Sequence, residues 1–119
     1  MKADNFKEKL KEKMDKYVHF VYRVTRDFPK EELYGATSQL RRAALSVILN
    51  YIEGFDRRKK LVQLNSLEIS YGSLKESKYL LHFSLVEKYL SKSNYEIGLK
   101  MAEEIGAMLW TEITNLDRK

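Results

Sequence analysis

Residues 6–28, FKEKLKEKMDKYVHFVYRVTRDF, place an apolar side chain at every third or fourth position. This spacing follows a period of seven, which puts the apolar side chains on one face of an α-helix. Asp4 or Asn5 can cap its first turn, and Pro29 disfavours helical geometry in the residue before it. We therefore predict a helix over about 5–27. Its apolar positions are Phe6, Leu10, Met14, Tyr17, Val21, Val24 and Phe28.

The same rhythm continues through the rest of the chain, with no strand-like alternation of apolar and polar residues. Ser93, with Glu96 three residues later, matches a capping box at the start of the last helical segment. One proline and five glycines leave few breaks, so the connections are short. We predict an all-α fold, an up-down-up-down antiparallel four-helix bundle in one domain over residues 1–119. The further helices cover about 37–56, 61–90 and 94–117.

The predicted helix over 37–56 is apolar around more than half of its circumference. Such a helix needs two partners, so it has a central position in the bundle or lies at a subunit interface. One apolar stripe consists of Leu40, Ala44, Val47 and Tyr51, and the next of Leu45, Ile48, Ile52 and Phe55.

The remaining face of this helix carries a line of polar side chains that allows two interpretations. They form a contact strip for a ligand or an RNA backbone, since arginine donates to phosphate and asparagine both donates and accepts. Alternatively they are structural: Ser46 and Asn50 bond each other inside the bundle, and Glu53 pairs with Arg57. We favour the structural interpretation, in which Glu68 and Glu76 of the next helix accept from an inward-facing arginine. The resulting structural polar stripe is Arg42, Ser46, Asn50, Glu53 and Glu76.

The composition excludes several kinds of chemistry. The chain has no cysteine, which removes disulfides, zinc ribbons, iron-sulfur clusters and thiol nucleophiles. A di-iron bundle needs Glu-x-x-His, but Lys16 and Tyr79 lie three residues before His19 and His82. The sequence has no glycine-rich phosphate loop and no known nucleophile or zinc motif. We therefore expect no enzyme activity, no catalytic or metal-binding residue and no cofactor.

The net charge of +5 lies in the first half of the chain. Residues 1–60 carry 15 Lys and Arg against 9 Asp and Glu, whereas residues 61–119 carry 7 against 8. Basic clusters can bind phosphates, but they can also be solvated helix faces, as the acidic residues among the opening lysines suggest. The candidate nucleic-acid-binding residues are Arg41, Arg57, Arg58, Lys59 and Lys60.

A resemblance is carried by the stretch Tyr34-Gly35-Ala36-Thr37-Ser38-Gln39-Leu40-Arg41-Arg42-Ala43-Ala44-Leu45, continued by Ser46-Val47-Ile48-Leu49-Asn50-Tyr51-Ile52-Glu53-Gly54. With Phe28-Pro29 before it and Gly72-Ser73-Leu74-Lys75-Glu76 after it, it resembles the small four-helix-bundle proteins encoded in intervening sequences of bacterial 23S rRNA genes. The family pattern is F-P-x-x-E, Y-G-L-x-x-Q-L-R-R-A, S-I-P-x-N-I-A-E-G and G-S-x-x-E. This chain departs from it at Ala36, Ile48 and Ile52, and Ile48 replaces a proline that would kink the helix.

The resemblance implies a ring-shaped homopentamer. It also implies kinship with the accessory variability determinant of diversity-generating retroelements, which engages nucleic acid and a reverse transcriptase. The residues that it singles out, as binding or building positions, are Arg41, Arg42, Ser46, Asn50, Glu53, Gly54, Gly72, Ser73 and Glu76.

Together these observations predict a non-enzymatic oligomeric bundle that binds RNA or DNA through basic surface residues. The alternative is a structural or protein-interaction bundle with no direct role in nucleic-acid binding. Expected partners are further copies of the chain, a nucleic acid, and a protein such as a reverse transcriptase. The longest uncharged run, Ala43 to Ile52, is ten residues, too short to cross a bilayer, so we expect a cytoplasmic protein without a membrane partner.

Overall fold

The computed structural model of the chain describes the backbone of residues 2–119 and the side chains of residues 5–119. Four long α-helices account for most of these residues, and two short helical turns connect the first pair. The elements are α1 (Lys2–Thr25), η1 (Lys30–Glu32), η2 (Leu33–Thr37), α2 (Ser38–Asp56), α3 (Lys60–Val86) and α4 (Lys92–Arg118).

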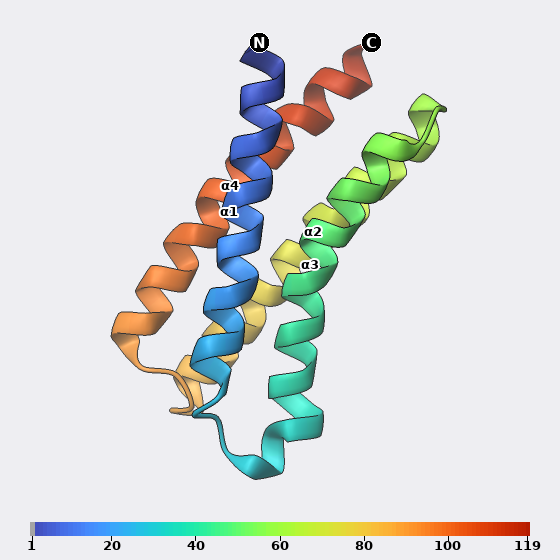
Figure 1. Cartoon of the computed structure of the whole chain (residues 1–119). Helices are drawn as coiled ribbons and strands as arrows, with labels where there is room; N and C mark the ends of the chain where they lie inside the picture. The colour runs from blue at the N-terminus through green and yellow to red at the C-terminus, as the bar shows by residue number, and fades with distance from the viewer. Residues whose placement is uncertain (1) are drawn as a thin grey trace.

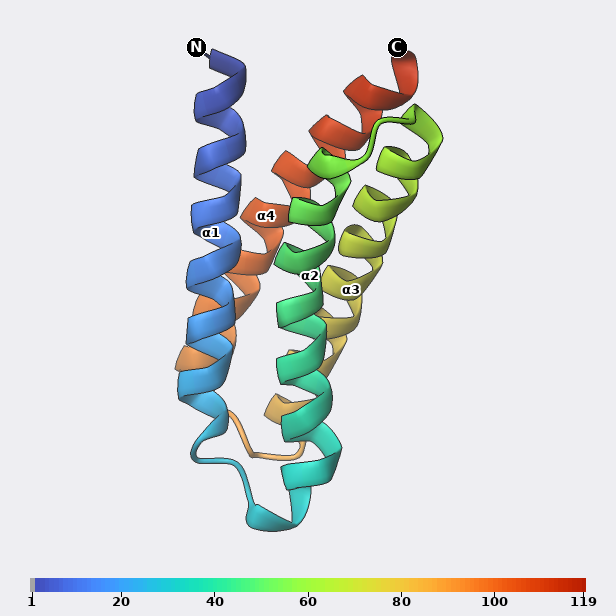
Figure 2. The ribbon, with the colours of Figure 1, turned by 45° about the vertical axis from the view of Figure 1, so that its right-hand side comes forward.

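The helices alternate in direction and form an antiparallel bundle of about 45 × 24 × 18 Å (Figures 1 and 2). The start of α1, the α2–α3 turn and the end of α4 lie at one end of the bundle (Figure 2). The connections from α1 to α2 and from α3 to α4 lie at the other end. The predicted all-α, up-down-up-down four-helix bundle is confirmed.

The core contains the apolar seam that the sequence predicts for α1. Leu10, Met14, Tyr17 and Val21 are fully buried, and Phe6 packs against the core from a half-buried position. The hydroxyl groups of Tyr17 and Ser77 form a hydrogen bond of 2.7 Å between α1 and α3. Burial raises the pKa of Tyr17 to about 12, although the Ser77 contact partly opposes this shift. Tyr17 therefore stays protonated in the core at neutral pH.

Small side chains line the seam between α2 and α3. The Ser70 hydroxyl donates to the Val47 carbonyl at 2.6 Å, so the two backbones approach closely. A Cβ atom at Gly54 would lie only 3.3 Å from Leu67 Cδ2. Apart from Ser73, the serines on this side of α3 are buried, namely Ser66, Ser70, Ser77 and Ser84. The sequence analysis did not identify this serine row.

The connection from α1 to α2 is held by the Glu32 carboxylate. It accepts from the Ala36 amide at 3.0 Å and from the Tyr89 hydroxyl at 3.1 Å. A Cβ atom at Gly35 would lie 2.6 Å from Glu32 Oε1, so only glycine leaves room for this cap. Gly35 has φ −114° and ψ −114°, a non-helical conformation that kinks the chain within η2.

The predicted start of α1 and the predicted end of α3 were wrong. Helix α1 begins at Lys2, so Asn5 lies inside the helix and neither Asp4 nor Asn5 is its N-cap. Helix α3 ends at Val86 instead of residue 90, because Lys88 takes a left-handed conformation with φ 67°. The amides of Lys88 and Tyr89 donate to the carbonyls of Leu85 and Ser84, which is a Schellman ending.

The predicted capping box at the start of α4 was also wrong. The Ser91 hydroxyl accepts from the Asn94 amide at 3.1 Å, and Ser93 lies within the helix. Because the Schellman ending has already reversed the chain, Ser91 is the residue placed to satisfy the first turn.

At the family's proline position, Ile48 lies within α2, which is one uninterrupted α-helix.

Gly98 and Gly72 provide a matched test of this packing. A Cβ atom at Gly98 would lie 2.8 Å from Phe20 Cε2, whereas one at Gly72 meets nothing within 4 Å. We expect Gly98→Ala to lower the free energy of unfolding by about 1 kcal/mol, because overpacking outweighs the gain in helix propensity. Gly72→Ala should raise it by about 1 kcal/mol. Urea unfolding measures both, and an equal gain in the two variants would contradict the close packing at Gly98.

Candidate functional site

The four consecutive basic residues 57–60 form the turn between α2 and α3, which we call the basic turn. Arg57 and Lys59 have extended backbone conformations, so α2 ends and α3 begins with no helical residue between them. All four side chains are exposed. The basic turn therefore lies at the end of the bundle, beside the end of α4 (Figure 2).

One of these four side chains is ion-paired, and another is hydrogen-bonded to a backbone carbonyl. Arg57 pairs with Glu53 on α2, and the Lys60 ammonium donates to the Asp117 carbonyl at 3.3 Å. Among the side chains of residues 5–119, none forms an ion pair with Arg58 or Lys59. The positive charge available to a ligand is therefore concentrated at the tip of the turn.

Arg41, the fifth predicted nucleic-acid-binding residue, lies elsewhere. It precedes Arg57 by 16 positions on one helix, or about 24 Å at 1.5 Å per residue. Its Nε donates to Thr25 Oγ1 at 2.8 Å, and its guanidinium lies 4.7 Å from the Tyr22 ring centroid. Arg41 thus fastens the start of α2 to the end of α1, where its charge also complements the helix dipole.

The lysines of α1 are largely paired with carboxylates. Lys7 Nζ lies 3.1 Å from Glu112, and Lys13 Nζ lies 2.9 Å from Glu104. Lys11 lies 3.1 Å from Glu8 on the same helix. These contacts correspond to the structural alternative for the opening lysines, whereas Lys9 and Lys16 have no ion-pair partner among residues 5–119.

The polar line of α2 lies along the seam with α3. Asn50 Nδ2 donates to the Ser46 carbonyl at 3.0 Å and to its hydroxyl at 2.9 Å. Ser46 also bonds the Ser73 hydroxyl at 2.8 Å. The predicted bond between Ser46 and Asn50 is therefore present, and Asn50 is half-buried rather than fully interior.

The other residues of the predicted structural stripe are exposed, namely Arg42, Glu53 and Glu76. Within residues 5–119 no hydrogen bond or ion pair joins either Glu68 or Glu76 to an arginine. The expected inward-facing arginine is therefore absent from this part of the chain, because all the arginines on α2 are exposed or bonded to α1.

A pocket of about 390 Å³, which we call the end pocket, opens beside the basic turn. Gln63 joins the pocket to the turn. Its side-chain amide donates to the Arg57 carbonyl, and its backbone amide donates to the Lys59 carbonyl. All four helices supply lining residues, which are Phe6, Lys7, Gly54, Phe55, Gln63, Leu67, Thr111, Glu112, Asn115, Leu116 and Lys119. This pocket could not be predicted from the sequence, because no local motif connects residues so far apart in the chain.

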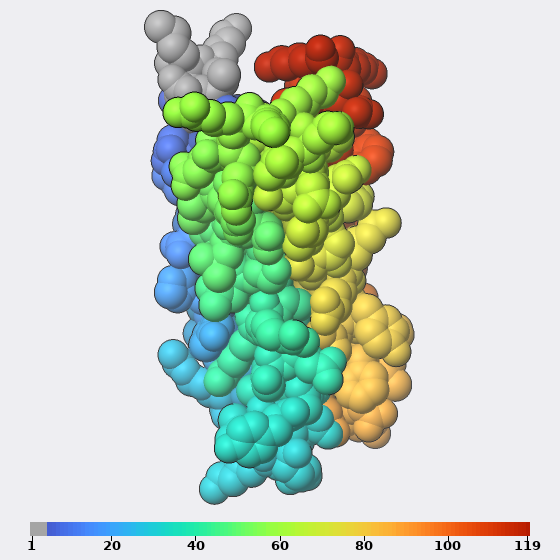
Figure 3. Space-filling view, turned by 90° about the vertical axis from the view of Figure 1, so that its right-hand side faces the viewer, coloured from blue at the N-terminus to red at the C-terminus, as the bar shows by residue number. Residues whose placement is uncertain are grey.

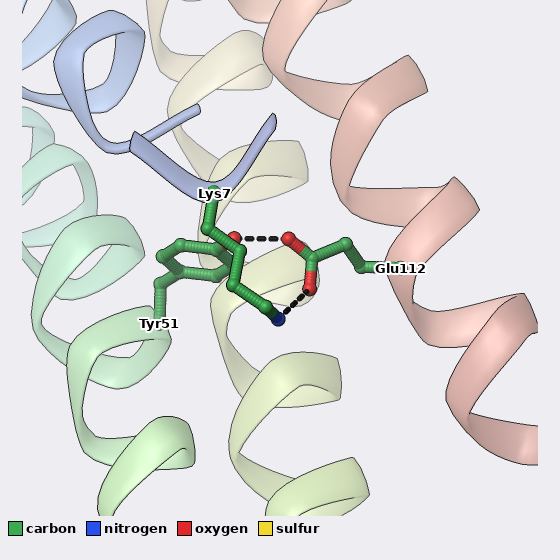
Figure 4. Close-up of polar contacts among 3 residues, drawn as sticks. All are labelled: Lys7, Tyr51 and Glu112. Atoms are coloured by element: carbon green, nitrogen blue, oxygen red, sulfur yellow. Dashed lines mark hydrogen bonds and ion pairs between the residues drawn. The ribbon is translucent and has the colours of Figure 1, made fainter. Parts of the chain in front are cut away.

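The wall of the end pocket contains a polar contact among three helices (Figure 4). The Tyr51 hydroxyl and the Lys7 ammonium both donate to the Glu112 carboxylate, the latter at 3.1 Å. Burial raises the pKa of Tyr51, and the neighbouring Glu112 carboxylate raises it further. Lys7 Nζ also lies 4.3 Å from the Phe55 ring centroid. The Glu112 side chain is only 11% exposed, so this contact fixes α1 and α4 to α2.

The second predicted apolar stripe of α2 is largely exposed, and α2 lies open on the face of the bundle shown in Figure 3. Leu45, Ile52 and Phe55 are 38, 43 and 36% exposed, and Ile48 is half-buried. Leu49, which is not a member of the predicted stripe, is 54% exposed beside them. We call Leu45, Ile48, Leu49 and Ile52 the α2 strip. The first stripe, by contrast, is fully buried in the core. A contiguous apolar strip of this kind is typical of a protein interface.

Residues 7–111 match the model of a protein family described as "23S rRNA-intervening sequence protein". The chain belongs to this family. A crystal structure of a protein of unknown function from the S23 ribosomal protein family of Bacteroides thetaiotaomicron VPI-5482 has a similar fold, with a TM-score of 0.85. The two chains are 19% identical, and the match covers 92% of this chain and 98% of the other. No curated protein matches the chain. The kinship with retroelement accessory proteins stays a prediction.

Neither a metal site nor a membrane-spanning helix is found in the described part of the chain. No group of three or more His, Asp or Glu residues is close enough there to hold a metal ion. No described helix combines the length and apolar character needed to cross a bilayer.

Glu112 and Glu104 allow a matched test of the contact at the end pocket. We expect Glu112→Gln to lower the free energy of unfolding by about 1–3 kcal/mol, because it removes a largely buried charge that holds Lys7 and Tyr51. Glu104→Gln removes only an exposed ion pair with Lys13 and should change stability little. Urea unfolding of both variants tests this difference, and equal effects would show that Glu112 contributes no more than a surface pair.

Proposed function

We propose that this protein is a non-enzymatic, cytoplasmic, oligomeric bundle that binds nucleic acid through the phosphate backbone. The observation that carries the proposal is the exposed basic turn, in which Arg58 and Lys59 have no ion-pair partner among residues 5–119. Arginine and lysine at an exposed turn can approach phosphates without disturbing the bundle. The charge is placed at one end of the molecule, so several subunits aligned in a ring would present it together.

An oligomer would bury exposed apolar area, and it would also bind nucleic acid more tightly than a single copy. The α2 strip exposes apolar area that costs about 25 cal/mol per Å² when left in water, and a second subunit would cover it. Each copy adds one basic turn, and linked sites gain avidity without any new contact. The homopentamer that the family resemblance implies would carry five such turns.

A protein-interaction bundle is the second candidate. Tyr34 is 92% exposed and Leu33 is 49% exposed on η2, a turn held in place by the Glu32 cap. Tyrosine is a common anchor residue at protein interfaces. This surface lies at the opposite end from the basic turn, so a protein partner and a nucleic acid could bind the same bundle.

Assembly through the α2 strip can be tested with two substitutions of similar exposure. We expect the wild type to sediment at micromolar concentration well above the monomer mass of 14.1 kDa. Leu49→Asp should shift it to the monomer, because a carboxylate would be buried at the interface. Ile97→Asp on α4, where the side chain is 48% exposed, should leave the assembly unchanged. A monomeric wild type would refute the oligomer, and equal behaviour of both variants would refute this interface.

Nucleic-acid binding can be tested by removing the four charges of the basic turn. A variant with Arg57, Arg58, Lys59 and Lys60 changed to Ser should lose most binding to labelled oligonucleotides. Binding by the wild type should weaken steeply with salt and depend little on sequence, because it rests on phosphate contacts. Fluorescence anisotropy at two salt concentrations measures both effects.

The control is a variant that loses the same formal charge elsewhere. Its exposed sites are Arg26, Lys30, Lys92 and Lys100, each changed to Ser. Because it retains the basic turn, this variant should bind nearly as well as the wild type. Equal losses in the two variants would mean that net charge alone attracts the oligonucleotide. No binding by the wild type at low salt would favour the protein-interaction candidate.

A further inference from the structure

We propose that the end pocket binds an unpaired nucleobase of the strand whose phosphates the basic turn holds. This inference rests on the proposed function and extends it from backbone contact to recognition of single-stranded or looped nucleic acid. It assigns a ligand to a pocket that no sequence motif indicates. The position, the lining and the charge of the pocket support this inference.

The pocket and the basic turn are continuous. Gln63 lines the pocket and donates to the carbonyl of Arg57 at 2.5 Å, so one wall of the pocket is bonded to the turn. Lys60 of the turn donates to the carbonyl of Asp117, next to the pocket residue Leu116. A phosphate held at the turn would therefore place its own base, or a neighbouring one, near the pocket.

The lining combines apolar and aromatic side chains with groups that bond base edges. Phe6 and Phe55 supply aromatic surface, on which any base can stack. Gln63 and Asn115 supply amide groups that both donate and accept hydrogen bonds. Pockets with a mostly apolar lining and a few polar groups are typical of small planar ligands.

Glu112 gives the pocket a preference among bases. Its carboxylate accepts one bond from Tyr51 and one from Lys7, which leaves acceptor capacity on each oxygen. Lys7 balances the carboxylate charge, so a polyanion is not repelled. A base with donors on its Watson–Crick edge fits this acceptor, and guanine presents two adjacent ones.

The pocket has the volume of a small-ligand site. Its volume of about 390 Å³ is at the lower end of the range for small-molecule sites, which is about 300–1,000 Å³. A base must leave the stack to enter it, which single strands and loops allow at little cost. We therefore expect single-stranded or looped RNA or DNA to bind more tightly than blunt duplex.

The direct test uses guanosine 5′-monophosphate and saturation-transfer NMR on the intact protein. Ribose 5-phosphate, which lacks the base, is the matched ligand control. We expect saturation to be strongest at the base proton H8, and weak or absent for ribose 5-phosphate. No transfer to the nucleotide, or equal transfer to the two ligands, would overturn the inference.

Two tryptophan variants test whether the nucleotide binds in the end pocket. Thr111 is exposed and lines the pocket, so Thr111→Trp fills it without altering the core. Ser93, exposed in the first turn of α4, lies outside the pocket, and Ser93→Trp is the control. We expect Thr111→Trp to weaken the nucleotide and single-stranded oligonucleotides by at least about fivefold, the lower end for one stacked base. Ser93→Trp should bind like the wild type.

These outcomes separate the inference from the proposed function. If Thr111→Trp binds single strands as well as the wild type while the basic-turn variant does not, only the pocket assignment fails. If the nucleotide binds the pocket but the basic-turn variant keeps full oligonucleotide binding, the proposed phosphate contact fails. A wild type that prefers duplex to single strand would also overturn the pocket assignment.

Discussion

The close packing of α2 against α3 is the contact on which the rest of the structure depends. It requires small side chains along the seam: Ser70 bonds the Val47 carbonyl, and Gly54 leaves no spare room beside Leu67. With this face of α2 committed to α3, and its first apolar stripe buried in the core, the α2 strip is left outside. The same packing brings the ends of α2 and α3 together, so that four consecutive basic residues form an exposed turn.

The contact among Tyr51, Glu112 and Lys7 has a different role, because it holds α1 and α4 to the α2–α3 pair at the end where the chain termini lie (Figure 4). A core of apolar side chains alone would leave this end poorly defined, since Phe6, the residue of the α1 seam nearest this end, is only half-buried. The polar contact fixes the walls of the end pocket beside the basic turn. The proposed phosphate contact and the proposed base-binding pocket thus lie at one end of the bundle, and the α2 strip lies exposed along its side.

The apolar period of seven was sufficient to predict the fold, because every helix carries it and Pro29 and Gly35 mark the first break. Where prediction failed, the cause was local. Lys88 occupies a left-handed position that usually takes glycine, so the end of α3 had no visible signal. The basic turn could be located from the sequence, but the bond from Arg41 to Thr25 could not, since it joins residues 16 positions apart on different helices. The end pocket required the tertiary structure, because Phe6, Gln63 and Glu112 belong to three helices.

The most direct test of the central claim, that nucleic acid binds the end of the bundle formed by the basic turn and the end pocket, is photo-crosslinking. A single-stranded oligonucleotide is irradiated with the wild-type protein, and the crosslinked peptides are identified by mass spectrometry. The account predicts crosslinks within residues 55–63 and 111–119, with the aromatic ring of Phe55 among the attachment points. Crosslinks confined to the opposite end, around Tyr34 and Tyr89, would contradict it.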